Sequence, residues 1–285
     1  MATKVKRVGF LGLGDMGLPM AKNIVTKGYD LIVCGHVRRT PIEEVKALGA
    51  KEVKTPKELA QLSDVIITML PDDIVTGDIL FGSNGIFEGA REGTGIILMS
   101  TLSPAFCRKV GEAAKAKRIE VLEAPVLGAR MRATTGELSI AVGGEKKLLE
   151  KYLPLLETMG KKITYFGDLG WAQTAKLASN MLNMVQTFAA YEVIAWGVKN
   201  GVSEEQLVEY LKSGSANNWA LQNWDYIKSM WVVPPPTSFY MGGKDLSYAL
   251  KIGQEIGQPC PFTALVCEIQ KAGPPDLSKL KLKNK

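Results

Sequence analysis

The sequence has few of the side chains that most often bind metals or form disulfides. It contains a single histidine, His36, and four cysteines, which lie without paired spacing at positions 34, 107, 260 and 267. A metal site built from Cys and His needs several such ligands at short spacing, so we expect no metal site. The same pattern offers no disulfide framework, and it favours a reducing, cytoplasmic location.

Long apolar runs are also missing. No stretch reaches the roughly 18 consecutive apolar residues that a transmembrane helix needs, so we expect no membrane span. The N-terminal MATKVKRVGFLGLG lacks a small-residue cleavage site and is interrupted by glycine, which indicates a first strand rather than a signal peptide. The net charge of +6 includes the tail KLKLKNK, and elsewhere Lys and Glu are interspersed, which favours solvated faces over a nucleic-acid surface.

The 285-residue chain changes pattern after its first half. In the first half, helical patterns separate short apolar runs that we predict to be strands, at 8–12, 31–35, 65–70, 95–100 and 119–126, with 138–144 and 163–167 extending the sheet. Strand–helix alternation of this kind implies a parallel sheet that is covered on both faces. The pairs Thr55-Pro56 and Ser103-Pro104 are typical of a helix cap followed by the first helical residue.

The strands stop after Gly170. Residues 171–200 predict one long helix, shorter helices follow it, and the prolines at 234–236 predict a loop over 232–243. The expected fold is therefore α/β: a doubly wound sheet domain over residues 1–165, followed by an all-α domain over residues 166–285 that is built on a long interdomain helix.

A glycine motif directly follows the first predicted strand. Gly12, Gly14 and Gly17 have the G-x-G-x-x-G spacing, between a strand and a helix. In that context the glycines permit a tight turn, close approach of a pyrophosphate and close packing of the next helix, whose N-terminus attracts the anion. We therefore predict a Rossmann dinucleotide site with contacts from five loop residues, Gly12, Leu13, Gly14, Asp15 and Met16.

The end of the second predicted strand bears on the choice of dinucleotide. An NAD site usually has Asp or Glu there to bind the ribose 2′-hydroxyl. This chain has Gly35-His36-Val37-Arg38-Arg39-Thr40, which contains two guanidinium groups and no acid. Because arginine suits a 2′-phosphate, Arg38 and Arg39 favour NADP, with NAD possible. The alternative is that one or both arginines face solvent.

The rest of the chain resembles the β-hydroxyacid dehydrogenase family, which includes 3-hydroxyisobutyrate dehydrogenases and succinic and glyoxylic semialdehyde reductases. Six motifs carry the resemblance in order along nearly the whole chain: GFLGLGDMGLPMAKNI (9–24), MLPDD (69–73), STLSP (100–104), EAPVLGA (123–129), GWAQTAKLASN (170–180) and GGKDLSYAL (242–250). The resemblance implies cofactor contacts from Met69, Leu70, Pro71, Ser100, Thr101 and Lys244. It further implies a substrate loop that contains Val126, Leu127, Gly128 and Ala129.

Two polar residues lie one turn apart on the long apolar helix. Lys176 and Asn180 project from the same helical face, and the resemblance implies that they are the catalytic lysine and a substrate-orienting amide, both in contact with substrate. Lysine suits general acid/base work because burial readily lowers its pKa. The alternative is that Lys176 extends along a core helix to reach solvent.

The chain departs from the family's pattern at the substrate. The usual A-P-V-S-G-G loop has a hydroxyl where this chain has Leu127, although Arg130 or Arg132 could bind an anion. The pocket could equally be more apolar and its substrate larger or uncharged. Leu98 replaces the usual Asp before the Ser-Thr pair, and aromatic residues between 219 and 240 could line a core, a dimer interface or a pocket.

The leading hypothesis is an NADP-dependent oxidoreductase that interconverts a short β-hydroxyacid and its semialdehyde. One alternative is an imine-reductase-like enzyme that acts on C=N bonds; such enzymes typically replace the catalytic lysine. Another is a non-catalytic dinucleotide-binding protein. We expect a small-molecule substrate and no nucleic-acid or membrane partner. The long apolar helix and the resemblance also predict a homodimer or homotetramer.

Overall fold

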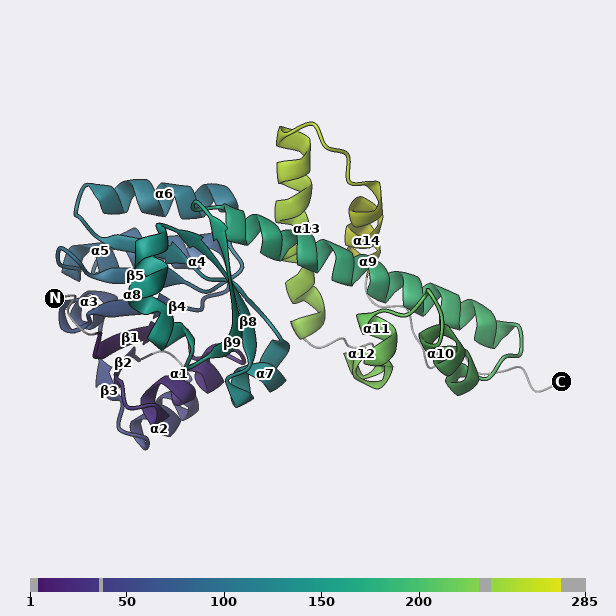
Figure 1. Ribbon diagram of the computed structural model, residues 1–285, viewed down its shortest axis with the longest axis horizontal. Coiled ribbons are helices and arrows are strands. Elements are labelled where there is room, and N and C mark those ends of the chain that lie inside the picture. The colour runs from purple at the N-terminus through teal and green to yellow at the C-terminus, as the bar shows by residue number, and fades with distance from the viewer. Residues whose placement is uncertain (1–4, 36–37, 231–236, 273–285) are drawn as a thin grey trace. The chain divides into compact units, whose positions relative to one another are not determined.

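The computed structural model describes residues 5–35, 38–230 and 237–272 (Figure 1). The chain divides into two compact units, Met1–Lys176 and Leu177–Lys285. The division falls inside helix α9 (Trp171–Lys199), eleven residues beyond the predicted boundary at 165/166.

The first unit is built on a nine-stranded sheet. Its parallel part has the order β3-β2-β1-β4-β5-β6, which is the order of the dinucleotide-binding fold. Strand β8 runs antiparallel to β6 and β7 and parallel to β9. The strands are β1 (Arg7–Leu11), β2 (Asp30–Cys34), β3 (Lys51–Val53), β4 (Val65–Thr68), β5 (Gly95–Leu98), β6 (Glu120–Glu123), β7 (Val126–Leu127), β8 (Leu138–Gly144) and β9 (Gly160–Gly167).

Each apolar run that was predicted as a strand contains one, with two differences of detail. The run 119–126 divides into β6 and β7, because Pro125 lies between them and cannot donate to a ladder. Strand β3 was not predicted, since Lys-Glu-Val is short and carries no apolar run at this edge of the sheet.

Helices cover both faces of this sheet, as predicted (Figure 1). Alternate residues of one strand enter different cores: Val65 and Ile67 of β4 face one core, and Ile66 faces the other. The first core is covered by α1 (Gly17–Thr26), α2 (Thr40–Lys46), α7 (Ala129–Thr135) and α8 (Lys146–Leu156). The second is covered by α3 (Pro56–Leu62), α4 (Asp73–Phe81), α5 (Ile86–Gly89) and α6 (Pro104–Lys115).

Both predicted helix caps are confirmed. The Thr55 hydroxyl accepts the Glu58 N–H at the start of α3, and the Ser103 hydroxyl accepts the Phe106 N–H at the start of α6. Each cap satisfies one of the N–H groups that a helix leaves unpaired at its start.

All the regular secondary structure among the described residues of the second unit is helical. The predicted long helix at 171–200 is confirmed as α9. It continues into this unit with α10 (Glu204–Lys212), α11 (Trp219–Gln222), α12 (Trp224–Met230), α13 (Thr237–Glu255) and α14 (Pro261–Lys271). These helices share one core, in which Phe188 and Ile194 of α9 are buried with Trp224, Leu246 and Val266.

The predicted loop at 232–243 is wrong over its second half. Helix α13 begins at Thr237 and therefore includes Gly242 and Gly243. Proline lacks the N–H that a helix interior needs, but a helix can begin directly after it, because the first N–H groups of a helix have no partner within the helix. Residues 232–236 of the prediction lie outside the described residues.

Candidate active site

The three motif glycines occupy different environments between β1 and α1. Gly12 has φ +99°, and an added Cβ would lie 2.1 Å from the Met69 carbonyl oxygen. A Cβ at Gly17 would lie 1.8 Å from the Gly12 carbonyl oxygen, whereas a Cβ at Gly14 would meet nothing within 4 Å. Gly12 and Gly17 are therefore required by packing, and the open space at Gly14 is where a ligand's pyrophosphate would approach.

The neighbouring loop residues and the first turn of α1 complete this cradle. Leu13 and Met16 pack against the first core, and Asp15 is exposed. The first turn of α1 carries no acidic residue, and no side chain caps its N-terminus. A helix start in this state offers N–H groups and a positive dipole end to an anion, so the loop fits a dinucleotide.

The two candidate 2′-phosphate residues differ in their interactions. Arg39 forms ion pairs with Glu43 at 2.7 Å and with Glu52 at 2.5 Å. Its hydrogen bond is the main cause that lowers the pKa of Glu52 to about 2. Arg38 is exposed, and among the described residues it has no ion pair. Arg38 is therefore available to a phosphate, whereas Arg39 would first have to exchange a carboxylate partner. His36 and Val37 lie outside the described residues.

A hydrogen bond joins the segments that follow β4 and β5. The Ser100 hydroxyl is 1% exposed and accepts the Leu70 N–H at 2.7 Å. Met69 and Thr101 are half-buried and Pro71 is exposed. The Ser100 side chain thus supports the 69–71 segment from within the protein.

The acidic residues of MLPDD explain why this motif and STLSP occur together. Asp72 caps α4 by accepting the Val75 N–H, and Asp73 accepts both the N–H and the hydroxyl of Ser103. The two helix starts after β4 and β5 are therefore linked. Sequence analysis did not assign roles to either aspartate, although Ser, Thr and Asp directly before a helix are known capping signals.

The predicted substrate loop is a tight turn between β7 and α7. Gly128 has φ +126° and Ala129 has φ +53°, so both lie in the left-handed region, which is strained for alanine. Val126 is buried, whereas Leu127 is 39% exposed and Met131 is 74% exposed. The loop therefore presents apolar side chains in the place where the family pattern has a hydroxyl.

The start of α9 is anchored to the sheet by a buried carboxylate. Glu123 is 0% exposed and accepts N–H groups of Gly170 at 2.8 Å, Ala172 at 2.7 Å and Gln173 at 3.1 Å. Burial raises the pKa of Glu123, and the hydrogen bonds from the helix start only partly oppose that rise. Lys176, half-buried, follows in the next turn of this anchored helix. The sequence predicted no supporting role for Glu123 or Gln173. Both lie inside the family motifs, but nothing local in the sequence indicates which backbone groups they contact.

The remaining predicted site residues meet in the second unit. The Asn180 amide donates to Asp245 Oδ2 at 2.6 Å, and Lys244 Nζ lies 3.4 Å from Asp245 Oδ1. Asp245 is 8% exposed and Asn180 is half-buried. The structure therefore brings Asn180, Lys244 and Asp245 together, within one unit.

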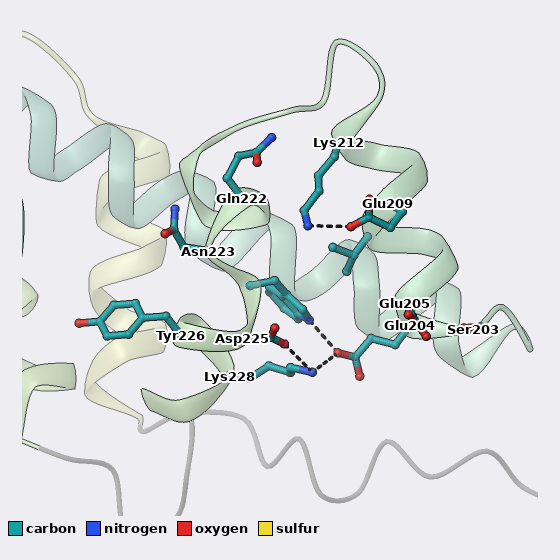
Figure 2. Close-up of a pocket in the computed structure, with 12 residues that line it drawn as sticks. Ser203, Glu204, Glu205, Glu209, Lys212, Gln222, Asn223, Asp225, Tyr226 and Lys228 are labelled. Carbon is teal, nitrogen blue, oxygen red and sulfur yellow. Dashed lines mark hydrogen bonds and ion pairs between the residues drawn. The ribbon is translucent and has the colours of Figure 1, made fainter. Parts of the chain in front are cut away.

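Two cavities in the described parts of the chain contain none of the predicted site residues. One, of about 780 Å³, lies between α10 and the α11–α12 segment. Figure 2 shows that Lys228 reaches both Glu204 and Asp225 in this cavity, while Lys212 pairs with Glu209. Four acidic side chains and two lysines line it, and each lysine pairs with at least one of the acids. A second cavity, of about 700 Å³, lies beside α6 and the start of β6.

Two further findings concern the described residues alone. They contain no group of three or more His, Cys, Asp or Glu side chains that could hold a metal ion. None of their helices combines the length and the hydropathy that crossing a bilayer requires.

Comparison with known proteins covers both units. Residues 7–167 match the model of the NAD-binding domain of 6-phosphogluconate dehydrogenase, and residues 170–279 match that of the NAD-binding region of NADP-dependent 3-hydroxyisobutyrate dehydrogenase. A probable mitochondrial 3-hydroxyisobutyrate dehydrogenase from Dictyostelium discoideum is 34% identical, over 89% of this chain and 81% of the relative. An NAD-dependent L-serine dehydrogenase from Pseudomonas aeruginosa is 32% identical, over 94% and 92%.

A solved structure agrees with these relatives. The Mycobacterium tuberculosis 3-hydroxyisobutyrate dehydrogenase with L-serine has a TM-score of 0.85 and 28% identity, and the match covers 97% of this chain and 98% of that one. The predicted fold class, a Rossmann-type domain followed by a helical domain, is confirmed. The chain belongs to the β-hydroxyacid dehydrogenase family of NAD(P)-dependent oxidoreductases.

Proposed function

We propose that this protein is an NADP-dependent oxidoreductase that interconverts a short β-hydroxyacid and its semialdehyde, with Lys176 as general acid and base. The observation that carries the proposal is the anchored start of α9. Buried hydrogen bonds tie the turn before Lys176 to Glu123 and to the segment of Ser100, which follows β5. A proton-transfer group needs this kind of fixed mounting near the cofactor-facing segments.

The residues around the glycine loop would hold the dinucleotide. Gly14 and the start of α1 would receive the pyrophosphate, Arg38 a 2′-phosphate, and the 69–71 segment with Thr101 the nicotinamide side. When bound, the nicotinamide supplies or accepts the hydride. The open space at Gly14 suits the pyrophosphate of either dinucleotide, and the exposed Arg38 supports NADP. NAD is the alternative, because Arg39 is paired with carboxylates.

The proton transfer is assigned to the side chains of α9. In oxidation, neutral Lys176 takes the proton of the substrate hydroxyl; in reduction, the Lys176 ammonium gives a proton to the forming alkoxide. Asn180 would orient the reacting oxygen or a neighbouring group, since Asp245 holds its amide. Lys244, beside Asp245, would contact cofactor or substrate.

The substrate loop favours a partly apolar substrate within this class. Leu127 and Met131 are exposed beside the turn at Gly128, and the exposed Arg130 and Arg132 could bind a carboxylate. A β-hydroxyacid with an apolar substituent would suit both kinds of side chain, because its substituent would contact the apolar side chains and its carboxylate would bind an arginine. The charge-neutral alternative is an imine substrate, which the same apolar loop would also accept, but imine-reductase-like enzymes typically replace the lysine that this chain has at position 176.

The test is a panel of β-hydroxyacids, aldehydes and cyclic imines, assayed by the oxidation or reduction of NADPH, NADH and their oxidised forms. Lys176→Ala should lower kcat about 10²–10⁴-fold, as expected for a positioned acid/base, with cofactor affinity nearly unchanged. Lys199→Ala, at the exposed end of the same helix, is the matched control. Normal turnover by Lys176→Ala, or turnover of imines alone, would contradict the proposal. An inert wild type that still binds dinucleotide would favour a non-catalytic role.

The assembly is proposed to be a homodimer or homotetramer in the cytoplasm. Leu182, Val193 and Trp196 of α9 are 60%, 44% and 69% exposed, and they follow one another along the helix at intervals that suit packing against a second copy. Light scattering of the wild type and of Trp196→Glu measures this: the variant should dissociate.

The four free cysteines agree with a reducing location.

A further inference from the structure

The side-chain amide of Gln173 makes both of its strong hydrogen bonds to one short backbone segment. Its Nε2 donates to the Ser100 carbonyl oxygen at 2.9 Å, and its Oε1 accepts the Leu102 N–H at 3.1 Å. The amide therefore pairs with the backbone on either side of Thr101. Gln173 is 0% exposed, so water does not compete for these bonds.

The same residue belongs to the anchored turn of α9. Its backbone N–H donates to Glu123, and Lys176 lies three residues further on, on the adjoining part of the same helical face. Ser100 in turn accepts the Leu70 N–H through its hydroxyl. A continuous chain of hydrogen bonds, part-buried at Leu70 and buried at Gln173, thus joins Leu70, Ser100, Gln173 and Glu123, entirely within the first unit.

A purely structural anchor for α9 would not need this arrangement. Glu123 already satisfies three N–H groups at the helix start, so the helix has its cap without Gln173. The amide instead selects the two backbone groups that flank Thr101. Its geometric effect is to set the separation between the segment assigned to the nicotinamide and the turn that carries Lys176.

We propose that Gln173 is a positioning residue that couples cofactor binding at residues 69–71 and 100–101 to the placement of the Lys176 ammonium. The inference rests on the proposed function, since it takes its roles for Thr101 and Lys176 from there. A misplacement of about 1 Å at such a site can cost about 100-fold in rate. Gln173 acts through Lys176 and does not itself touch the reacting atoms.

Two variants of Gln173 separate hydrogen bonding from packing. Gln173→Met has a similar shape and removes both bonds. Gln173→Glu, when protonated, can still donate through its hydroxyl and accept through its carbonyl, whereas the ionised form cannot donate. Gln61→Met, an exposed residue of α3, is the control for the substitution itself.

Kinetics give the first result. Gln173→Met should lower kcat about 10–100-fold, shift the pH profile that reports Lys176, and leave the dissociation constant of NADPH within about threefold of the wild type, as expected for an unaltered phosphate site. The kcat of Gln173→Glu relative to wild type should be higher at low pH and fall as the carboxyl ionises. Gln61→Met should match the wild type.

Hydrogen–deuterium exchange of the protein without substrate, measured by mass spectrometry, gives a second result that needs no turnover. NADPH should slow exchange in wild-type peptides that cover 69–71, 100–102 and 170–178. In Gln173→Met it should slow exchange in the first two only, because the connection to α9 is cut. The same measurement on Gln173→Glu keeps the test decisive if the methionine variant fails to fold.

The outcomes distinguish this inference from the proposed function. If Gln173→Met keeps the wild-type kcat, pH profile and exchange pattern, or if Gln173→Glu shows no pH-dependent recovery, Gln173 is not a positioning residue. Normal turnover by Lys176→Ala would instead overturn the proposed role of Lys176. Loss of NADPH protection over 170–178 in Gln173→Met would still establish the coupling in that case.

Discussion

Asn180 Nδ2 donates a 2.6 Å hydrogen bond to Asp245 Oδ2, which joins two residues that lie 65 positions apart in the sequence. Asp245 is nearly buried. The bond fixes which end of the Asn180 amide faces Asp245. The orientation of the proposed substrate-orienting group therefore depends on a residue to which no contact with substrate or cofactor is assigned.

Replacing Asp245 should therefore affect catalysis through Asn180. Asp245→Ala leaves the Asn180 donor without this acceptor, and we expect kcat to fall about tenfold and the free energy of unfolding to fall by about 1–3 kcal/mol. Asp245→Asn keeps an acceptor oxygen and should lose much less of both. Steady-state kinetics and urea unfolding of the two variants measure this; equal effects would show that the charge, rather than the acceptor, matters.

The glycine loop offers a test that separates ligand binding from packing. Gly14→Ala meets no protein atom within 4 Å, so stability should be unchanged while affinity for dinucleotide falls at least tenfold, because the methyl group occupies the ligand's approach. Gly17→Ala would collide with the Gly12 carbonyl, so it should destabilise the first unit itself. Thermal unfolding and calorimetric titration with NADPH provide the two measurements. Wild-type affinity in Gly14→Ala would show that the pyrophosphate does not bind at this loop.

The choice between NADP and NAD can be tested one arginine at a time. Arg38→Ala should weaken NADPH binding about tenfold or more and leave NADH nearly unchanged, because only the former carries the 2′-phosphate. Arg39→Ala should have a smaller selective effect, since Arg39 already pairs with Glu43 and Glu52. Equal weakening of both cofactors in fluorescence titrations would argue against the NADP preference.

The ion pair of Arg7 and Asp64 should give the first unit a pH-dependent share of its stability. Burial raises the pKa of Asp64, but hydrogen bonds from the Arg7 side chain and from the N–H groups of Lys6 and Arg7 outweigh this, so the pKa lies below its ordinary 3.8. A lowered pKa means that the stabilisation is fully present above pH 3.8 and is lost as the pH falls through the folded-state value.

Asp64→Asn is the matching variant. At neutral pH we expect it to cost about 1 kcal/mol of unfolding free energy, a modest value because Arg7 is 43% exposed and solvent screens the pair. The difference from the wild type should shrink as the pH falls below 3.8. Urea unfolding at several pH values measures both proteins. A difference that grows on acidification would contradict the assigned direction.

Local signals in the sequence were sufficient for most of the fold. Apolar runs between helical patterns predict the central strands, because strands buried on both faces must be apolar throughout. Ser103 and Thr55 predict helix starts through a contact three residues away. Where such local signals were weak, prediction failed: β3 is a short edge strand, and α13 begins directly after the prolines.

By itself the sequence determined the alternation of strands and helices, the glycine loop after β1, and the spacing that puts Lys176 and Asn180 on one face of α9, since each of these depends on residues close together in the chain. Only the tertiary structure decided that Glu123 anchors α9, that Gln173 pairs with the backbone around Thr101, and that Asp245 holds Asn180. Those bonds join residues 47 to 73 positions apart. Buried polar groups must find partners wherever folding places them, and no local pattern specifies which partners those are.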